Sequence, residues 1–554
     1  MPITRWIRGA KLSFARLPIR GGAPSEPAYI YRDPWKGDAE QGARIVSGRF
    51  LFERQEYSFP SGRWDQGTWP EPAQEWLHSF CWLRDLRALG SDEARLTARA
   101  LVSHWLSYPP TDLLVKNASV TGARLAAWIA NHEFALASAD RRIQQKFMER
   151  LLQEGRTIAA FLPLPAQGWK GLKALKGLLA VALAIPEQTG FMSRFLRYLP
   201  AEIERLILAD GMVAERSPEA QFQAARELTE MSIMFRTAHS SVPPILETSL
   251  DKVCPVLRAM RHGDGALAVF NGSRELYSSV IDEVLAQGAR QKLLAPSMSQ
   301  GLFTRLALGK ALLIMDNGPP AAEGFDKRAH AGTLSFEFSY QRHRLFVNCG
   351  SAEVGAWNKA LRASPAHTVL VADGLSSSDF NAEGRVVRRP AHVMCEHQTD
   401  GTAHWLETSH DGYYPPLGLK WTRNLYLGGE GEDLRGQEIV EGERATPFAL
   451  RFHIHPDVTV IRDDEDIILK VGGMVWRFRQ KGGQINLEND IYVARGRVEK
   501  TQQIVVESIQ YKISSEDNKL QESDEASSKD SLSENKEKKK FSQTVTWLLE
   551  RIPE

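Results

Sequence analysis

The chain has 554 residues, 43% of them hydrophobic and 25% charged, a composition that excludes wholesale disorder and predicts more than one globular domain. Its 69 Lys and Arg residues nearly balance its 68 Asp and Glu residues, so the net charge of +1 gives no general attraction to nucleic acid, and we expect no such partner. The four cysteines lie far apart and lack the paired spacing of a zinc finger or a redox motif.

Residues 1–34 are predicted to be a basic extension. The opening MPITRWIRGAKLSFARLPIRGG places Trp6, Ile7 and Phe14 near one helical face, with arginines elsewhere. Such a helix can lie on a membrane surface, or it can be an ordinary first helix docked on the fold. No secretory signal is visible, and no later run approaches the roughly 20 apolar residues of a membrane span. We therefore expect no transmembrane span, and peripheral membrane contact through the extension stays open.

Residues 35–285 are predicted to form a helical domain. Apolar positions recur at three and four residues in segments such as WLHSFCWLRDLRALG, ARLAAWIANHEFALA and FMERLLQEGRTIAAFL. Short breaks such as YPP and IPEQTG separate these segments. Successive helices with short connections must pack antiparallel, either as a bundle or as a ring of hairpins.

Residues 286–512 change to a period of two. The segments TLSFEFS, RLFVNCG, HTVLVADG, RFHIHPDVTVI and GMVWRFRQ are short, rich in β-forming residues and bounded by Gly, Asn, Asp or Pro. Many such strands without helices between them predict an antiparallel β-sandwich. The fold class is therefore α+β, with a helical domain followed by a sandwich.

The end of the chain changes character twice. Residues 513–541 have almost no aromatic or β-branched side chains and are predicted to be a disordered, charged tail. Residues 542–554 regain apolar character through Val545, Trp547 and Leu549, and we expect a short amphipathic helix there. This helix would dock on its own protein or bind a partner.

Three separated motifs resemble those of the heparinase II/III family of polysaccharide lyases. They are DGMVAERSPEAQ from Asp210 to Gln221, HGDGALAVFNGS from His262 to Ser273, and the series RAHAGTLSF, FVNCG and SPAHTVLV. The resemblance implies an α/α toroid followed by a β-sandwich, with an acidic polysaccharide held between them and cleaved by β-elimination.

The chain departs from the family at the positions that carry this chemistry. The resemblance places Ala220 and Gln221 where the family has a Tyr-His pair, and Trp169 and Lys170 where it has an Asn-His pair. Arg328 stands at the first histidine of the HxH motif. Arginine cannot act as a base near neutral pH, but it can bind a carboxylate in a bidentate manner.

Elimination requires a group that neutralises the sugar carboxylate and groups that move protons. The candidate catalytic residues are Arg328, Arg216, His410 and Tyr413. The candidate substrate-binding residues are Glu215, Trp169, His262 and Asn271. For Glu215 and Arg216 the alternative is a capping pair, because an adjacent acid and base near a helix start often have that role. For the HDGY loop the alternative is a plain turn, which the DG pair alone predicts.

The resemblance also implies a structural zinc ion, whose ligand positions hold His330, Asn348 and His367. A neutral Asn oxygen is a poorer zinc ligand than a carboxylate, so two strand histidines hydrogen-bonded inside the sandwich are the alternative. The adjacent Cys349 could replace Asn348 only if the strand pleat allowed it, because successive residues face opposite sides. His453 would suit a metal by its spacing from His455, but we interpret it as structural without a third ligand.

Two functions follow from these residues. The first is a lyase acting on a uronate-containing polysaccharide, and the second is a glycan-binding or envelope-assembly protein that retains the lyase scaffold without its chemistry. Family resemblance favours the cell envelope or periplasm, and the lack of a visible signal makes the cytoplasm the alternative location. A third functional alternative is a cytoplasmic or membrane-surface interaction protein.

Overall fold

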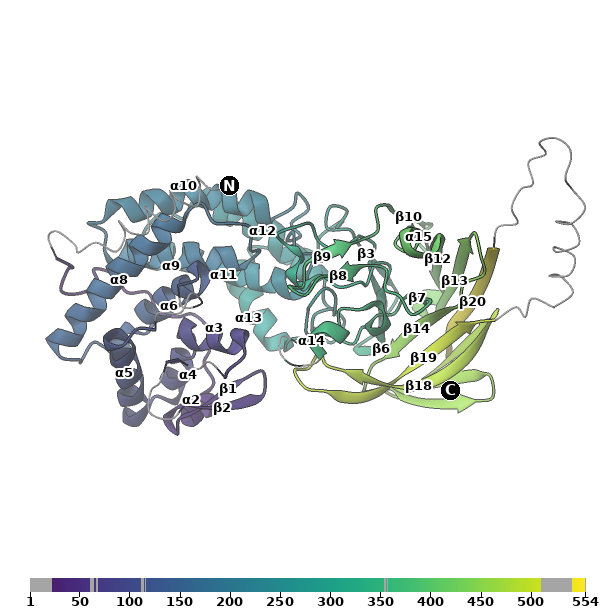
Figure 1. Cartoon of the computed structure of the whole chain (residues 1–554), viewed down its shortest axis with the longest axis horizontal. Coiled ribbons are helices and arrows are strands. Elements are labelled where there is room, and N and C mark those ends of the chain that lie inside the picture. The colour runs from purple at the N-terminus through teal and green to yellow at the C-terminus, as the bar shows by residue number, and fades with distance from the viewer. Residues whose placement is uncertain are drawn as a thin grey trace, which may run out of the picture.

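The protein is described by a computed structural model over residues 22–59, 64–65, 68–110, 114, 116–352, 355, 357–509 and 541–553. The helical domain forms one end of the elongated molecule and the β-domain forms the other (Figure 1). Residues 1–21 of the predicted basic extension and residues 510–540, which include 513–540 of the predicted tail, lie outside the described residues. Among the described helices, none combines the length and hydrophobicity that crossing a membrane requires.

The helical domain begins earlier than predicted, because Tyr31 is buried in its core and donates a hydrogen bond to the carbonyl of Ala126 at 3.0 Å. Its helices are α2 (Ala39–Val46), α3 (Glu71–Ser79), α4 (Leu83–Leu89), α5 (Asp92–Ser107), α6 (Ala118–Ala130), α7 (His132–Ala135), α8 (Arg141–Phe161), α9 (Lys170–Ala184), α10 (Thr189–Leu206), α11 (Pro218–Thr237), α12 (Pro244–Ala259) and α13 (Ser278–Gly288). A hairpin of β1 (Arg49–Phe52) and β2 (Gln55–Ser58) precedes α3.

Helices α6, α9 and α11 form the inner layer, in which α9 contacts both of the others, and α8, α10 and α12 pack against them from outside. All residues of α6 are buried, which explains why its sequence has no polar face. The helices α6 and α9 approach closely because Gly122 and Gly177 face each other, and a Cβ atom on either residue would overlap the partner backbone. The helices therefore pack in two layers, an inner and an outer set.

The β-domain consists of two antiparallel sheets that face each other across one core. The inner sheet contains β18 (Gly483–Tyr492), β19 (Glu499–Ser508), β14 (Phe448–Ile454), β6 (His343–Val347), β5 (Phe336–Tyr340), β4 (Ala311–Asp316) and β3 (Phe303–Leu308) in that order, and β7 (Leu370–Ala372) also pairs with β14. The outer sheet contains β10 (Val393–Thr399), β11 (His404–His410), β12 (Leu419–Gly428), β13 (Asp433–Gly442), β20 (Phe541–Ile552), β17 (Met474–Lys481), β16 (Asp466–Val471) and β15 (Thr459–Asp463). Smaller elements are the pair β8 (Asp379–Phe380) and β9 (Val386–Arg388) and the short helices α14 (Trp357–Ala360) and α15 (Tyr414–Leu417). The sandwich predicted from the period of two is confirmed.

The predicted C-terminal helix is wrong, because Phe541–Ile552 forms strand β20 in the middle of the outer sheet. It pairs antiparallel with β13 on one side and with β17 on the other. Val545, Trp547 and Leu549 alternate with more exposed residues and point into the core, a period of two that two neighbouring strands stabilise. The last segment is therefore an integral part of the sandwich.

Buried and partly buried charged residues join the two domains. Arg344 of β6 donates to Asp264 of the helical half at 2.8 Å and to the carbonyl of Leu267 at 2.9 Å. Glu275 accepts from Tyr492 at 2.5 Å and from Arg495 at 3.1 Å. Since unpaired buried charges are costly, these contacts hold the domains in one orientation and define the space between them.

Candidate functional site

A cleft lies between the helical domain and the inner sheet. It consists of two adjoining cavities of about 340 Å³ and about 450 Å³, whose walls share Pro72, Glu75, Trp169, Lys170 and Arg328. The smaller cavity extends between the inner helices, and the larger one extends to the β-domain and includes His330. Three predicted site residues and one predicted metal ligand therefore meet here: Trp169, Glu215, Arg328 and His330.

Cationic side chains outnumber carboxylates along the walls of this cleft. The cations are Arg84, Lys170, Lys173, Lys176, Arg226, Arg274, Lys327, Arg328, Arg362 and Arg385. The carboxylates are Glu71, Glu75, Asp85, Glu215, Glu219, Glu227 and Glu230. A cleft with an excess of one charge concentrates ligands of the opposite charge even when the whole chain is nearly neutral.

The start of α9 forms the central wall. Trp169 is 8% exposed, and the ammonium group of Lys173 lies 4.6 Å from the centre of its ring. The Nζ of Lys170 lies 2.7 Å from Glu75. An indole and an ammonium group thus stand where the resemblance implies an amide and an imidazole.

Sequence reasoning missed the lysines deeper in this wall. Lys176 lies 2.8 Å from Glu227 and 2.9 Å from Glu230, and Glu230 also accepts from the indole of Trp35 at 2.7 Å. The sequence does contain a signal for these lysines, since Lys170, Lys173 and Lys176 recur every three residues in the otherwise apolar KGLKALKGLLAVALA. Three cations on one side of an apolar helix need acidic partners or an anionic ligand.

Glu215 is the carboxylate of the cleft whose pKa is best suited to proton transfer near neutral pH. It is buried, and its Oε2 accepts a hydrogen bond from the backbone N–H of Trp169 at 3.0 Å. Burial raises its pKa to about 7, although the Trp169 N–H and the charge of Arg328 oppose the shift. Near neutral pH this residue is therefore present in both protonation states.

Arg328 ends a short 3-10 helix, Asp326–Arg328, on the opposite wall. Its guanidinium donates to the carbonyl of Gly272 and lies 3.5 Å from Glu219. It can bind the carboxylate of a ligand, but it cannot accept a proton near neutral pH.

His330, His367 and Asn348 form a directed hydrogen-bond chain. The amide nitrogen of Asn348 donates to the carbonyl of Val269 at 3.0 Å, so its Oδ1 points toward the other two partners. This oxygen accepts from Nδ1 of His367 and from the N–H of Thr368, both at 3.2 Å. The Nε2 of His367 is then an acceptor for Nδ1 of His330 at 3.2 Å. The remaining nitrogen of His330, Nε2, is left as an acceptor on a residue that lines the cleft.

Both imidazoles are neutral at physiological pH. Burial lowers the pKa of His367 to about 3, with a contribution from the charge of His453. Burial also holds the pKa of His330 well below its ordinary value, and His367 and the nearby arginines act in the same direction. The hydrogen-bond chain is consistent with this, because each ring carries one proton.

The predicted three-ligand zinc set does not fit this geometry. Asn348 contacts Nδ1 of His367, whereas His330 faces Nε2 on the other side of the same ring. One ion cannot contact all three donors, and two imidazoles alone are fewer protein ligands than zinc sites use. Asn348 therefore orients His367 and is not a metal ligand in this arrangement.

Arg216 connects the domains and does not line the cleft cavities. It forms an ion pair with Asp316 and donates to the carbonyls of Gly301 at 2.8 Å and Leu302 at 3.0 Å. Its guanidinium donors are engaged in these contacts within the domain interface. The predicted catalytic role of Arg216 is therefore not supported by its position.

His262 and Asn271 also belong to the domain interface. The two ring nitrogens of His262 contact Glu337 at 2.9 Å and Ser339 at 2.7 Å, which leaves none for a substrate. Asn271 donates to Asp316 at 2.9 Å and accepts from the backbone N–H of His330 at 3.2 Å. Asn271 thus holds the His330 backbone from behind the cleft wall.

His410 and Tyr413 lie within the sandwich. The hydroxyl of Tyr413 donates to the carbonyl of Leu370 at 2.5 Å, and Nδ1 of His410 accepts from the N–H of Gly412 at 3.0 Å. Burial lowers the pKa of His410 to about 3. The predicted catalytic roles of His410 and Tyr413 are therefore not supported, because the fold packs both side chains into the core.

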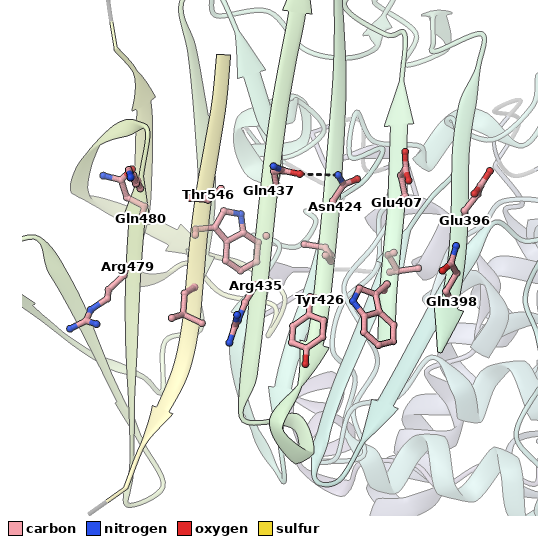
Figure 2. Close-up of a pocket in the computed structure, with 17 residues that line it drawn as sticks. Glu396, Gln398, Glu407, Asn424, Tyr426, Arg435, Gln437, Arg479, Gln480 and Thr546 are labelled. Carbon is pink, nitrogen blue, oxygen red and sulfur yellow. Dashed lines mark hydrogen bonds between the residues drawn. The ribbon is translucent and has the colours of Figure 1, made fainter. Parts of the chain in front are cut away.

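A larger groove of about 940 Å³ crosses the solvent face of the outer sheet. Figure 2 shows polar side chains from neighbouring strands along it, among them Glu407, Asn424 and Arg435. Trp405, which also lines it, is 41% exposed. None of the predicted site residues lines this groove.

Comparison with known proteins agrees with this architecture. Residues 290–546 match the family model described as heparinase II/III-like, C-terminal. A crystal structure of heparinase III superposes with a TM-score of 0.72 at 12% identity, covering 98% of this chain and 89% of that one. A heparan sulfate lyase of Pedobacter heparinus gives a TM-score of 0.55 at 13% identity, covering 99% and 88%. The fold is that of heparinase III, and residues 290–546 are similar to the heparinase II/III-like C-terminal family.

A curated relative of similar length is FtsZ-localized protein C of Caulobacter vibrioides. It is 27% identical over 529 residues, which cover 89% of this chain and 88% of the relative. The similarity therefore extends through both domains.

Proposed function

We propose that this protein binds an acidic polysaccharide in the interdomain cleft and serves in assembly at the cell envelope. The observation that carries the proposal is the excess of cations around Trp169. Uronate carboxylates pair with arginine and lysine, and an indole offers an apolar face to the C–H side of a sugar ring. The groups that resemblance assigns to catalysis are replaced by Ala220, Trp169, Lys170 and Arg328, so binding is the property that we expect the cleft to retain.

The full-length relative supports the assembly role. Its name places it with FtsZ, and the present chain would associate with FtsZ in the same way. Co-sedimentation of the full chain with FtsZ filaments tests this association, and a chain that stays in the supernatant at all filament concentrations would reject it.

The binding proposal is tested with heparan sulfate, alginate, hyaluronan and bacterial exopolysaccharides, and with neutral dextran as the uncharged control. Arg328→Gln and Trp169→Ala are expected to weaken binding of the preferred polymer at least about tenfold, since a charge-assisted contact contributes about 1.5–3 kcal/mol. Trp405→Ala, in the outer-sheet groove, is the matched control and should bind as the wild type does. Loss of binding in Trp405→Ala with full binding in Trp169→Ala would place the ligand on the outer sheet and reject the cleft.

A second function, β-elimination, is favoured by the presence of Glu215 and His330 in one cavity. Arg328 would neutralise the uronate carboxylate and so acidify the C5 proton. The free nitrogen of His330 would accept that proton, the C4–O4 bond would break with its electron pair on O4, and protonated Glu215 would protonate O4. The products would be an unsaturated uronate and a new free chain end.

Elimination is measured as the ultraviolet absorbance of the unsaturated product. His330→Gln and Glu215→Gln should each abolish it, whereas Glu71→Gln, an exposed carboxylate of the same cavity, should not. Polymer binding without any absorbance change for the wild type would reject elimination and leave the binding function standing.

A further inference from the structure

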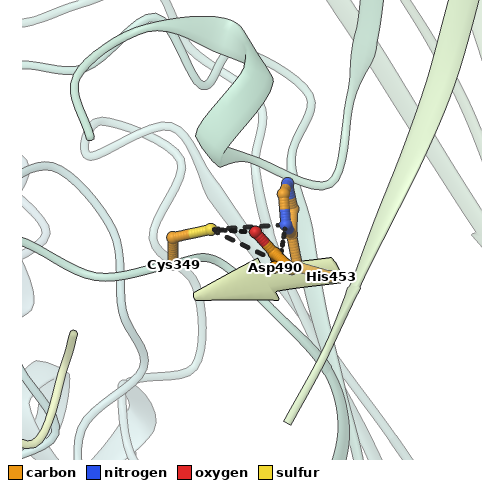
Figure 3. Close-up of side chains that lie close together, drawn as sticks. All are labelled: Cys349, His453 and Asp490. Carbon is orange, nitrogen blue, oxygen red and sulfur yellow. Dashed lines mark hydrogen bonds and ion pairs between the residues drawn. The ribbon is translucent and has the colours of Figure 1, made fainter. Parts of the chain in front are cut away.

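A second cluster of potential metal ligands lies directly behind the histidine chain. Cys349 follows strand β6, His453 is in β14 and Asp490 is in β18, so three separate parts of the inner sheet supply it. Figure 3 shows the sulfur, the imidazole and the carboxylate converging on one point. The thiol and the imidazole are buried, and the Asp490 side chain is 10% exposed.

The distances between the donor atoms are close to those of a metal site. Sγ of Cys349 lies 3.3 Å from Nδ1 of His453 and 3.8 Å from each oxygen of Asp490. The shortest separation, between Nδ1 and Oδ2 of Asp490, is 2.6 Å. Ligand atoms of a tetrahedral zinc ion stand roughly 3.3–3.6 Å apart, from Zn–S near 2.3 Å and Zn–N near 2.0 Å. The separation between Cys349 and His453 lies in this range, and the carboxylate of Asp490 has to move away from Nδ1 to admit the ion.

The arrangement is not that of a Cys-His-Asp nucleophile. In a catalytic triad the nucleophile and the carboxylate occupy opposite nitrogens of the imidazole. Here Cys349 and Asp490 both approach Nδ1, and Nε2 donates to the backbone carbonyl of His367 at 3.1 Å. Cys349 is also packed among Leu361 and Val493, where no substrate reaches it.

The contact between Nε2 of His453 and the carbonyl of His367 is of the kind that orients metal-ligating histidines. A histidine that ligates through one nitrogen usually donates its other N–H to a carbonyl or carboxylate, which fixes its orientation. The backbone around Cys349 is equally fixed, because its carbonyl accepts from the N–H of Val493 at 2.7 Å and its N–H donates to Ala366 at 3.0 Å. The donors are thus held on rigid strands.

We propose that Cys349, His453 and Asp490 bind a structural zinc ion, with the second Asp490 oxygen or a water as fourth ligand. Thiolate, imidazole and carboxylate together suit zinc, and the thiolate disfavours magnesium and calcium. The ion ties β6, β14 and β18 together and holds the carbonyl of His367, whose ring supports His330 in the cleft.

This position differs from the one that family resemblance implies, although the two are adjacent in sequence. Asn348 faces His367, and Cys349 faces the other side of the chain toward His453. Consecutive residues of an extended segment point in opposite directions. An asparagine at position 348, where the family has an aspartate, therefore does not affect the ligands around Cys349.

The test is metal analysis of the purified full-length chain after growth with added zinc. We expect one zinc per chain, its loss in Cys349→Ser, His453→Gln and Asp490→Asn, and its retention in the double variant His330→Ala/His367→Ala. Cys254→Ser, which changes a buried cysteine outside the cluster, is the matched control and should keep the metal.

Cobalt separates metal loss from misfolding. Cobalt added to the metal-free wild type should give a thiolate-to-metal charge-transfer band, which Cys254→Ser retains and Cys349→Ser lacks while its far-ultraviolet circular dichroism is unchanged. If Cys349→Ser does not fold, Asp490→Asn is the variant that decides. A wild-type chain that takes up neither zinc nor cobalt, or zinc that disappears only in His330→Ala/His367→Ala, overturns the proposal.

Discussion

Replacing Glu215 by glutamine should make the protein more stable, and increasingly so as pH rises. Its pKa is raised from 4.5 to about 7 in the folded protein, chiefly by burial. At about 1.4 kcal/mol per pKa unit, this shift corresponds to about 3 kcal/mol. Because the folded pKa of a carboxyl group is raised, the folded state binds the extra proton, and its stability falls as pH rises from about 4.5 through 7. Glutamine keeps an acceptor oxygen for the N–H of Trp169 and never ionises.

The assay is urea denaturation of wild type and Glu215→Gln at several pH values between 5 and 8. The stability difference in favour of the variant should grow by about 2–3 kcal/mol across this range. Glu71→Gln removes an exposed carboxylate from the same cavity and serves as the control. A difference between wild type and Glu215→Gln that does not change with pH would refute the reasoning, because it would mean that Glu215 titrates alike in the folded and unfolded chain.

Three further predictions concern the scaffold. Arg216→Met should destabilise the protein by about 3–5 kcal/mol in urea denaturation, since it leaves Asp316 buried without its cation; a change below 1 kcal/mol would contradict the role of this pair in joining the domains. Gly436→Ala should cost about 1–3 kcal/mol, because a Cβ atom there overlaps the buried indole of Trp547, and an unchanged midpoint would be evidence against this close packing. Truncation after residue 509 removes β20 and exposes the edges of β13 and β17, so the product should aggregate in size-exclusion chromatography, whereas a monodisperse product would show that the strand is dispensable.

Local patterns predicted the two kinds of domain but not the last strand. Val545, Trp547 and Leu549 alternate strictly, yet Leu548 and Ile552 add apolar positions that also fit a helix. The strand exists because β13 and β17 leave a gap between them, and both end 60 or more residues before it begins. No local pattern contains that information.

The candidate site was predictable in part. The motifs around Glu215 and Arg328 identified residues that do meet in the cleft, together with Trp169 and His330. His410 and Tyr413 carried the right chemical groups but lie in the core, because a DG turn signals a change of direction and not exposure. Side-chain chemistry can be recognised from sequence, whereas access to solvent depends on what packs against it.

The sequence by itself predicted the order of a helical and a β domain and the resemblance to the heparinase II/III family. Those properties follow from periodicity and from short motifs, which are local. Only the tertiary structure decided that Asn348 orients His367, that Arg216 joins the domains, and that Cys349 meets His453 and Asp490. Each of these contacts joins residues distant in sequence, and the direction of a side chain at such a meeting is fixed by strand pairing and pleat, not by the residues beside it in the chain.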